Sequence, residues 1–355
     1  MYDIIIVGAG PAGSTLARLL KKDYNILLLE KRNFSDNSSD IHKCCGGLLA
    51  PDAQLMLAKF GLGIPKSVLL SPQLFAVRVI DLDNTIERYY QRHYINVDRG
   101  KFDKWLMDMI DSDVQIVNES IYKTHQEKED HVIVTFHKKG KTYEKTAKLL
   151  IGADGAFSQV RRQSFNSHSQ PDLYIAIQEW FKDHNDKKYF GAIFDKEITD
   201  FYSWTIPKGN YLIVGGALKP HKNVDKKFQK LKTKLGTYGY NLEESIKKSG
   251  GYLYRPVKSK QICLGNKRVA LVGEAAGFIS PSSAEGISYA FRSSLALSKA
   301  LRKGIDDYQK AYQNNLKSLM LNITRKNLKC PAMYNKYLRK LVMKSGIITV
   351  KPESV

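Results

Sequence analysis

The sequence predicts an α/β fold in which a Rossmann-type nucleotide-binding domain is interleaved with an antiparallel β-sheet domain and followed by a C-terminal helical segment. Three observations predict this fold. A buried strand runs into a glycine-rich loop and a helix at residues 3–20. Two further buried strands, near 147–152 and 267–272, each lead into a glycine next to an acid. Between these segments, apolar and polar residues alternate, which is typical of half-buried antiparallel strands.

The first of these segments has the features of a dinucleotide site. DIIIVG, residues 3–8, is an unbroken β-branched run typical of a buried parallel strand. Gly8, Gly10 and Gly13 then satisfy GxGxxG, which allows a tight turn and a close approach of a pyrophosphate to the helix N-terminus. A second apolar strand ends at Glu30, where a carboxylate can accept hydrogen bonds from a ribose hydroxyl. This order of elements does not by itself distinguish FAD from NAD.

The two later segments favour FAD. One passes from its strand to Asp154 and Gly155, and the other to Gly273 and Glu274. FAD is an extended ligand whose AMP, pyrophosphate, ribityl chain and flavin must all be held, so several such segments are needed. Together they resemble the motifs of the para-hydroxybenzoate-hydroxylase-fold flavoproteins. The third motif of that family is usually Gly-Asp, and Glu274 keeps the carboxylate on a longer arm.

The resemblance implies non-covalent FAD, since no His or Cys lies in a recognisable flavin-attachment motif. Gly286 begins a helix whose N-terminus can face the flavin C2 oxygen. Arg99, before another helix, is a candidate contact with the cofactor. The implied cofactor-binding residues are Gly8, Gly10, Pro11, Ala12, Gly13, Glu30, Lys31, Cys45, Gly46, Gly47, Arg99, Asp154, Gly155, Gly273, Glu274, Pro281, Gly286 and Ile287.

Two more stretches narrow the resemblance. KCCGG, residues 43–47, resembles the KPCGG of the geranylgeranyl reductase family, a branch of the same fold, with Cys45 as the family cysteine and Cys44 in place of proline. FYSWTIP, from residue 201, resembles the family's YxWxFP strand. With GEAAGFISPSSAEGISYA, the chain is most similar to the colicin-M-resistance-associated (CbrA) subgroup. The implied catalytic candidates are Cys45, Tyr202 and Trp204.

Both stretches leave alternatives open. Cys45 is either catalytic or a small apolar filler beside the flavin. Tyr202, Trp204 and Ile206 alternate along one strand, so they form either an apolar wall of a substrate site or the core of a sheet.

The domain boundaries follow from the motifs. We expect an FAD domain from 1–74, 98–170 and 256–305, a substrate sheet from 75–97 and 171–255, and basic helices over 306–355. A helix break is predicted at Pro331. The basic helices are either a cap on the substrate domain or an interfacial membrane segment.

Composition, charge and cysteine content limit the partners and the cellular location that we expect. The 355 residues are 43% apolar and carry a formal charge of +21, which indicates either a solvated lysine-rich surface or attraction to an anionic lipid surface or an acidic partner. Nucleic acid is not expected, because no matching motif accompanies the charge. Four cysteines without CxxC predict a reducing compartment and no metal site. Without a signal peptide or a transmembrane run, we expect a cytoplasmic protein, with peripheral attachment to the inner face of the membrane left open.

The function that the resemblance implies is an FAD-dependent oxidoreductase that reduces C=C bonds of an isoprenoid or other hydrophobic lipid. With no second GxGxxG, NAD(P)H would bind transiently, or an electron-donor protein would reduce the flavin. The same fold allows an FAD-dependent monooxygenase acting on an aromatic or lipid substrate. A flavin halogenase is a further alternative, because SWTIP half-resembles the WxWxIP strand of such enzymes. The non-enzymatic alternative is a flavin-stabilised peripheral lipid-binding protein.

Overall fold

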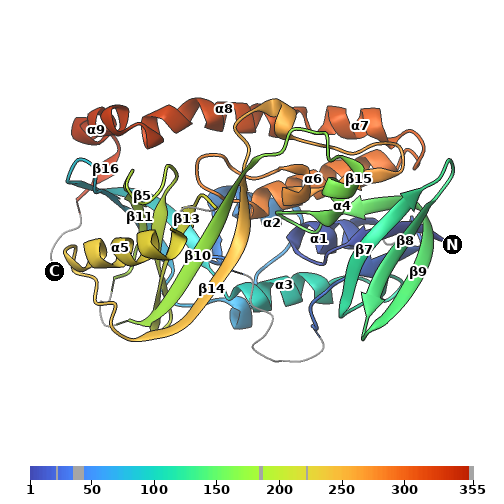
Figure 1. Ribbon diagram of the computed structural model, residues 1–355, viewed down its shortest axis with the longest axis horizontal. Helices are drawn as coiled ribbons and strands as arrows, with labels where there is room; N and C mark the ends of the chain where they lie inside the picture. The colour runs from blue at the N-terminus through green and yellow to red at the C-terminus, as the bar shows by residue number, and fades with distance from the viewer. Residues whose placement is uncertain (21–22, 35–43, 184–186, 221–222, 352–355) are drawn as a thin grey trace. The chain divides into compact units, whose positions relative to one another are not determined.

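The computed structural model describes residues 1–20, 23–34, 44–183, 187–220 and 223–351. The chain divides into two compact units and passes repeatedly between them (Figure 1). The first unit consists of Met1–His42, Gly100–Asp172 and Tyr254–Lys326, and the second of Lys43–Arg99, Leu173–Leu253 and Asn327–Val355. Residues 44–74, expected in the FAD domain, thus belong to the second unit, and the C-terminal segment is shared between both units. Lys43 of the KCCGG motif lies outside the described residues.

In the described part of the first unit, seven strands form one sheet in the order β6-β2-β1-β9-β8-β7, with β15 paired to β9. The strands are β1 (Tyr2–Val7), β2 (Ile26–Leu29), β6 (Gln115–Val117), β7 (Ser120–Glu127), β8 (Val132–Lys138), β9 (Lys141–Gly152) and β15 (Val269–Leu271). β6, β2, β1, β9 and β15 run parallel. Ile4, Ile5 and Ile6 have no exposed surface, as their unbroken apolar run predicts.

Helices and turns of the first unit complete its core. They are α1 (Pro11–Leu20), α3 (Arg99–Asp108), α4 (Gln159–Ser164), η2 (Ser259–Gln261), η3 (Gly273–Ala276), α6 (Ile287–Leu301) and α7 (Tyr308–Asn315), with Arg99 itself belonging to the second unit. α1 packs on α6, and the Ser294 hydroxyl donates to the carbonyl oxygen of Ala12 at 2.8 Å. This contact fixes the start of α1 relative to α6.

The second unit is built on a larger sheet with the order β14-β10-β13-β12-β11-β4-β5-β16, to which β3 adds by pairing with β5. The strands are β3 (Leu48–Leu49), β4 (Leu74–Asp81), β5 (Ile86–Asn96), β10 (Asp172–Lys182), β11 (Phe190–Phe194), β12 (Ser203–Lys208), β13 (Tyr211–Leu218), β14 (Ser245–Arg255) and β16 (Thr349–Val350). The predicted antiparallel sheet contains one parallel pair, β4 with β11, beside antiparallel pairs such as β12 with β13 and β4 with β5. No hairpin joins β4 and β11, because the chain passes through the first unit between them.

One face of the second sheet is covered by α5 (Val224–Gly236), whose Phe228, Leu231 and Leu235 are fully buried in a core with β11 and β13. The Thr205 hydroxyl lies 3.2 Å from that of Tyr240 in this core. Since side chains alternate along a strand, even-numbered residues of β12 lie on the opposite face.

The remaining helices of the second unit are α2 (Pro51–Lys59), η1 (Lys66–Val68), the last turns of α8 (Lys317–Tyr334) and α9 (Lys336–Ser345). The predicted break at Pro331 is wrong, because Pro331 lies in the last turn of α8 and its carbonyl still accepts from the Asn335 amide at 3.0 Å. The break falls at Asn335, whose side-chain oxygen caps α9. Among the described residues, no helix is long and apolar enough to cross a membrane.

Candidate functional site

The three nucleotide-binding segments predicted from the sequence meet at the carboxyl ends of β1, β9 and β15. Gly8 has φ +101°, and a Cβ there would lie 2.7 Å from the carbonyl oxygen of Ala153. Gly273, with φ +59°, would bring a Cβ within 2.9 Å of the Ala12 side chain. The first segment therefore lies directly against the second and the third. Ligands of doubly wound sheets bind at this edge.

The glycine loop fits a pyrophosphate. A Cβ at Gly13 would stand 1.8 Å from the carbonyl oxygen of Gly8, so only glycine allows the loop to close on α1. A Cβ at Gly10 would meet nothing within 4 Å, which leaves open space before the N-terminus of α1. Pro11 and Ala12, the next candidates, form the first turn of this helix. An anion placed there is favoured by the helix dipole and by the free amide groups of a first turn.

Glu30 also has a local role within the protein that the sequence did not predict. Its buried carboxylate accepts hydrogen bonds from the Ala9 amide at 2.6 Å, from the Arg32 amide and from two nitrogens of the Arg32 guanidinium. These four bonds match the roughly four acceptor positions of a carboxylate. A ribose hydroxyl would have to replace one of them. Lys31, another predicted cofactor contact, lies between Glu30 and Arg32 in the sequence and is exposed to solvent.

Arg32 is a functional candidate that the sequence analysis missed. It is mostly buried, and the third nitrogen of its guanidinium donates to Asp103 at 2.8 Å. Arg32 therefore positions the Glu30 carboxylate, which accepts a hydrogen bond from the Ala9 amide of the glycine loop. The sequence could have indicated this role, because Arg32 follows Glu30 by two residues. In an extended chain, side chains two residues apart lie on the same side.

The second and third segments are connected to each other. Asp154 accepts from the Ser158 hydroxyl and from the amides of Gln159 and Val160, so its carboxylate orients the turn into α4, while Gly155 takes a positive φ of 76°. Arg161, fully buried, donates to the carbonyl oxygen of Ala275 at 3.3 Å. Glu274 accepts from the Tyr254 amide at 3.0 Å.

The N-terminus of α6 carries an acid that the prediction did not consider. Gly286 precedes the helix, which begins at Ile287. The Glu285 carboxylate accepts from the Ser288 amide at 2.7 Å and from its hydroxyl at 2.6 Å. Pro281, further back in the loop, uses its carbonyl to accept from Arg255 at 3.1 Å. This helix end therefore has an internal anion at its positive pole.

Candidates in the second unit form a separate cluster around Cys45. The Arg99 guanidinium donates to the sulfur of Cys45 at 3.1 Å, and the Gly47 amide lies 3.5 Å from it. Cys44 points elsewhere, with its sulfur 3.5 Å from the carbonyl oxygen of Ala176. None of the four cysteines, all of which lie in the described part of the chain, forms a disulfide. A guanidinium beside a sulfur stabilises the thiolate form, so only one of the two adjacent cysteines has a setting typical of a reactive thiol.

Lys208 completes this cluster and was not predicted. Its amine donates to the carbonyl oxygens of Gly47 at 2.9 Å and Val97 at 2.8 Å, so it bridges the loop that carries Cys45 and the segment that leads to Arg99. Burial lowers the pKa of Lys208 to about 7, although Cys45 and Asp98 act in the opposite direction. The two acceptors provided by these described residues match the two N–H bonds of a neutral amine.

Tyr202, Trp204 and Ile206 lie on the same side of β12 as Lys208. The ring centroids of Tyr202 and Trp204 are 5.6 Å apart. The Ile206 side chain packs so closely on Gly46 that a Cβ at Gly46 would lie 2.5 Å from the Ile206 Cδ1 atom. All three are buried, and burial raises the pKa of Tyr202. The indole nitrogen of Trp204 is buried without a hydrogen-bond partner among the described residues. The nitrogen lies against Gly215 of the neighbouring strand β13, where a Cβ would be 2.4 Å away.

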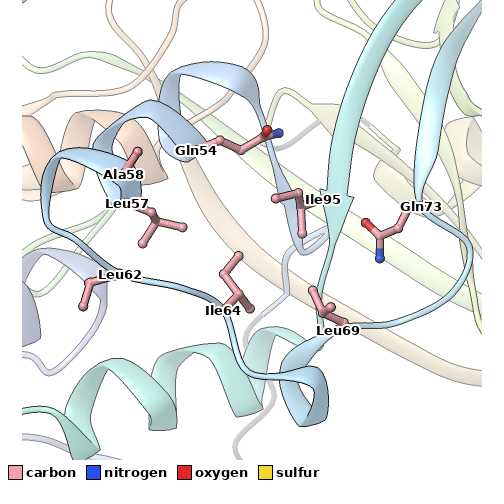
Figure 2. Close-up of a pocket in the computed structure, with 8 residues that line it drawn as sticks. All are labelled: Gln54, Leu57, Ala58, Leu62, Ile64, Leu69, Gln73 and Ile95. Atoms are coloured by element: carbon pink, nitrogen blue, oxygen red, sulfur yellow. The ribbon is translucent and has the colours of Figure 1, made fainter.

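A hollow of about 410 Å³ opens in the same unit (Figure 2). Its lining is mainly aliphatic: Leu57, Ala58, Leu62, Ile64, Leu69 and Ile95, with Gln54 and Gln73 at its edge. Gln54 donates to the carbonyl oxygen of Leu49 at 2.8 Å, and Gln73 accepts from the Asn96 amide at 2.9 Å. Since both glutamines already bond to backbone, the hollow offers mostly apolar surface.

The predicted site residues thus separate into two groups. Cys45, Gly46, Gly47, Arg99, Tyr202 and Trp204 belong to the second unit, and the other predicted residues to the first. In the first unit the structure brings the three glycine segments together, and in the second it brings Arg99, Gly47 and Cys45 together. Their contact with a cofactor stays a prediction.

Comparisons with known proteins agree with this architecture. Residues 6–35 match the family described as an NAD(P)-binding Rossmann-like domain. The chain is 38% identical over 346 residues to protein CbrA of Escherichia coli O6:H1, covering 98% of this chain and 94% of that protein. Among solved structures, a geranylgeranyl bacteriochlorophyll reductase-like protein of Thermoplasma acidophilum superposes with a TM-score of 0.80 at 21% sequence identity. The match covers 96% of this chain and 90% of that protein's chain. A mutant of the halogenase PltM in complex with FAD has a TM-score of 0.69 at 15% identity, covering 95% and 78%. These similarities show the predicted α/β flavoprotein fold with its Rossmann-type domain.

Proposed function

The chain belongs to the CbrA family, and from this premise we propose that it is an FAD-dependent oxidoreductase that reduces a carbon–carbon double bond of a hydrophobic, isoprenoid-type lipid. The observation that carries the proposal is the hydrogen bond from Arg99 to the sulfur of Cys45 beside an apolar wall. It combines a proton source with surroundings suited to an apolar substrate.

The first unit has the residues to hold FAD. The open space at Gly10 and the first turn of α1 would take the pyrophosphate. Glu30 and Arg32 keep the loop in the required shape, and Asp154 and Glu274 fix the loops next to it. When bound and reduced by NAD(P)H or an electron-donor protein, FAD would supply a hydride to one carbon of the double bond.

The second unit would supply the proton. The S–H bond of Cys45 breaks as its proton passes to the other alkene carbon, so the double bond gains one hydride and one proton. The electron pair left on sulfur is stabilised by the Arg99 guanidinium at 3.1 Å and by the Gly47 amide at 3.5 Å. Lys208 holds both segments in register through Gly47 and Val97.

The substrate class is inferred from the surroundings of this thiol. Tyr202, Trp204 and Ile206 are buried on the face of β12 that carries Lys208, so the neighbours of the thiol on this side are aromatic and aliphatic. Elsewhere in the same unit, the aliphatic hollow, whose lining does not include Cys45, has the size of a small-molecule site.

The test is anaerobic turnover with reduced flavin and geranylgeranyl diphosphate as the probe. We expect flavin reoxidation coupled to a product that gains one H₂ per double bond by mass spectrometry. Cys45→Ser should lower this turnover at least about tenfold, as expected for loss of a positioned proton donor. Cys44→Ser is the matched control and should retain it, with equal flavin content in both variants.

Other outcomes would separate the alternatives. A product carrying oxygen from O₂ under aerobic conditions would identify a monooxygenase and overturn the proposal. A halogenated product with added halide and an aromatic substrate would identify a halogenase. Flavin that is never reoxidised by any alkene, in a protein that still binds lipid, would favour a non-enzymatic role.

A further inference from the structure

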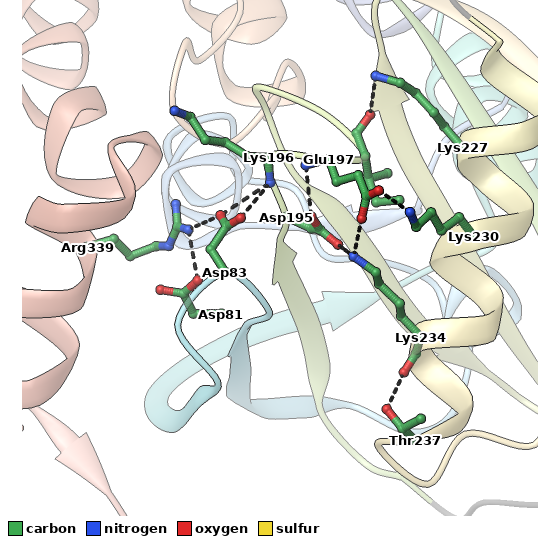
Figure 3. Close-up of polar contacts among 11 residues, drawn as sticks. Asp81, Asp83, Asp195, Lys196, Glu197, Lys227, Lys230, Lys234, Thr237 and Arg339 are labelled. Carbon is green, nitrogen blue, oxygen red and sulfur yellow. Dashed lines mark hydrogen bonds and ion pairs between the residues drawn. The ribbon is translucent and has the colours of Figure 1, made fainter.

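One face of α9 is firmly attached to the second unit. The Arg339 side chain, 4% exposed, donates to Asp81 at 2.8 Å and Asp83 at 2.6 Å (Figure 3). Met343, one turn later, is also buried, and its carbonyl oxygen accepts from Arg88 at 3.0 Å. After the helix, β16 pairs with β5. The end of the C-terminal segment, α9 and β16, therefore packs on the sheet of the second unit.

The opposite face of α9 is apolar and exposed. With about 100° between successive residues, Arg339 and Met343 point to one side, while Tyr337, Leu338, Leu341 and Val342 cover an arc centred on the other. Leu341 is 67% exposed, and the other three are also classed as exposed. This order is the reverse of an ordinary surface helix, whose apolar stripe faces the core.

The turn after α9 adds two more exposed apolar side chains. Ile347 is exposed and Ile348 is 80% exposed, just after Gly346, the C-cap of α9. Ile348 has φ +62°, a conformation that β-branched residues rarely adopt. The Thr349 hydroxyl and the Gly346 carbonyl oxygen, 2.8 Å apart, close this turn. We call these six residues, Tyr337, Leu338, Leu341, Val342, Ile347 and Ile348, the α9 apolar face.

Lysines lie beside the α9 apolar face. Lys336, Lys340 and Lys344 follow one another at intervals of four, so they line one side of the helix. Residues 308–352 contain no Asp or Glu, and the whole chain carries +21. Asp81 and Asp83, the carboxylates that pair with α9 among the described residues, bond to Arg339 on its buried side. The exposed side of α9 thus combines apolar and cationic groups.

We propose that the α9 apolar face is a docking site for a membrane surface that contains anionic lipid. Apolar side chains at such a surface enter the boundary between head groups and acyl chains, while flanking lysines interact with anionic head groups. The charge of α9 favours this occupant over a second copy of the chain, since two copies would bring like-charged lysine rows together. The proposal is independent of the reaction proposed above.

The experiment is co-sedimentation of the full-length protein with phosphatidylcholine vesicles, with and without phosphatidylglycerol. We expect binding only with phosphatidylglycerol, and a steep loss between about 0.05 M and about 0.5 M salt, as the screening length falls from about 14 Å to about 4 Å. Two variants separate the contributions. Leu341→Gln with Ile348→Asn removes apolar surface without changing the charge, and Asn tolerates the left-handed turn. Lys340→Glu with Lys344→Glu reverses charge without changing the apolar residues.

We expect each double variant to weaken vesicle binding at least about tenfold, since one lysine near an anionic surface contributes about fivefold. Matched controls are Leu55→Gln with Ile246→Thr, two other exposed apolar residues, and Lys59→Glu with Lys226→Glu, with the same charge change. Both controls should bind almost as the parent does, the second with a modest loss from net charge. Circular dichroism must show that all variants are folded.

Two results would overturn the proposal. One is vesicle binding that is absent at low salt or equal in the α9 variants and their controls. The other is a concentration-dependent dimer, seen by light scattering and abolished by Leu341→Gln with Ile348→Asn, which would make a second copy the occupant.

Discussion

The Nη1 nitrogen of Arg99 lies 3.1 Å from the sulfur of Cys45. The neighbouring Cys44 instead has its sulfur 3.5 Å from the carbonyl oxygen of Ala176. A guanidinium stabilises a thiolate, whereas a carbonyl acceptor can bond only to the protonated thiol. The two adjacent cysteines should therefore differ in chemistry despite their shared position in the sequence.

The first prediction is that iodoacetamide alkylates Cys45 faster than Cys44 at neutral pH. Arg99→Met should slow alkylation of Cys45 about tenfold and leave Cys44 nearly unchanged, because the stabilising cation is lost at one sulfur only. Peptide mass spectrometry over a time course measures both rates in one sample. Equal rates for the two cysteines in the parent protein would contradict the assigned role of Arg99.

A second prediction concerns Lys208 and pH. Burial lowers its folded-state pKa to about 7 from an ordinary value of 10.5. Between these values the unfolded chain binds the proton and the folded chain does not, so the free energy of unfolding should rise with pH in this window. Lys208→Met lacks this contribution. Its stability deficit relative to the parent should therefore grow from pH 7 to pH 10, by at most about 1.4 kcal/mol per unit.

Urea unfolding at several pH values measures this difference, with Lys226→Met on the exposed side of α5 as control. A constant deficit across the range would show that Lys208 stays protonated in the folded protein. The loss of its two hydrogen bonds would then be the whole effect.

A third prediction distinguishes two glycines of the same loop. Gly10→Glu should abolish FAD binding and leave the unfolding temperature of the apoprotein nearly unchanged, because its Cβ meets nothing within 4 Å while its charge opposes a pyrophosphate. Gly13→Ala should destabilise the apoprotein itself, because the Cβ would stand 1.8 Å from the Gly8 carbonyl oxygen. Flavin absorbance per protein and thermal melts provide the two measurements. Full flavin content in Gly10→Glu would exclude this space as the pyrophosphate site.

A fourth prediction concerns the attachment of α9. Arg339→Met should lower the free energy of unfolding by about 3–5 kcal/mol, since it leaves the fully buried Asp81 without its cation. Adding Asp81→Asn should recover part of that loss, because the remaining group is neutral. Denaturant unfolding of the two variants and the parent gives the comparison. If the single variant is as stable as the parent, α9 is not held by this ion pair.

Much of the first unit could be predicted from the sequence alone. Its strand, glycine loop and helix are contiguous, and each carries a periodicity or glycine pattern that neighbouring residues enforce. The place of Lys208 was also open to prediction, because the alternation that placed Tyr202, Trp204 and Ile206 on one face continues to residue 208. The partners of Glu30 were less accessible. Asp103, which shares Arg32 with it, lies far along the chain and meets it only through the fold.

The C-terminal segment shows most clearly what the sequence determines and what the tertiary structure determines. The sequence by itself determined that 336–345 is an amphipathic helix, because its lysines and apolar residues recur at helical spacing. Only the tertiary structure decided which side faces the protein. A single helix cannot show that the turn between β4 and β5 offers Asp81 and Asp83 as counter-charges for Arg339. Because those carboxylates make it possible to bury an arginine, Arg339 and Met343 face the sheet, and the leucines that would otherwise have been buried remain at the surface.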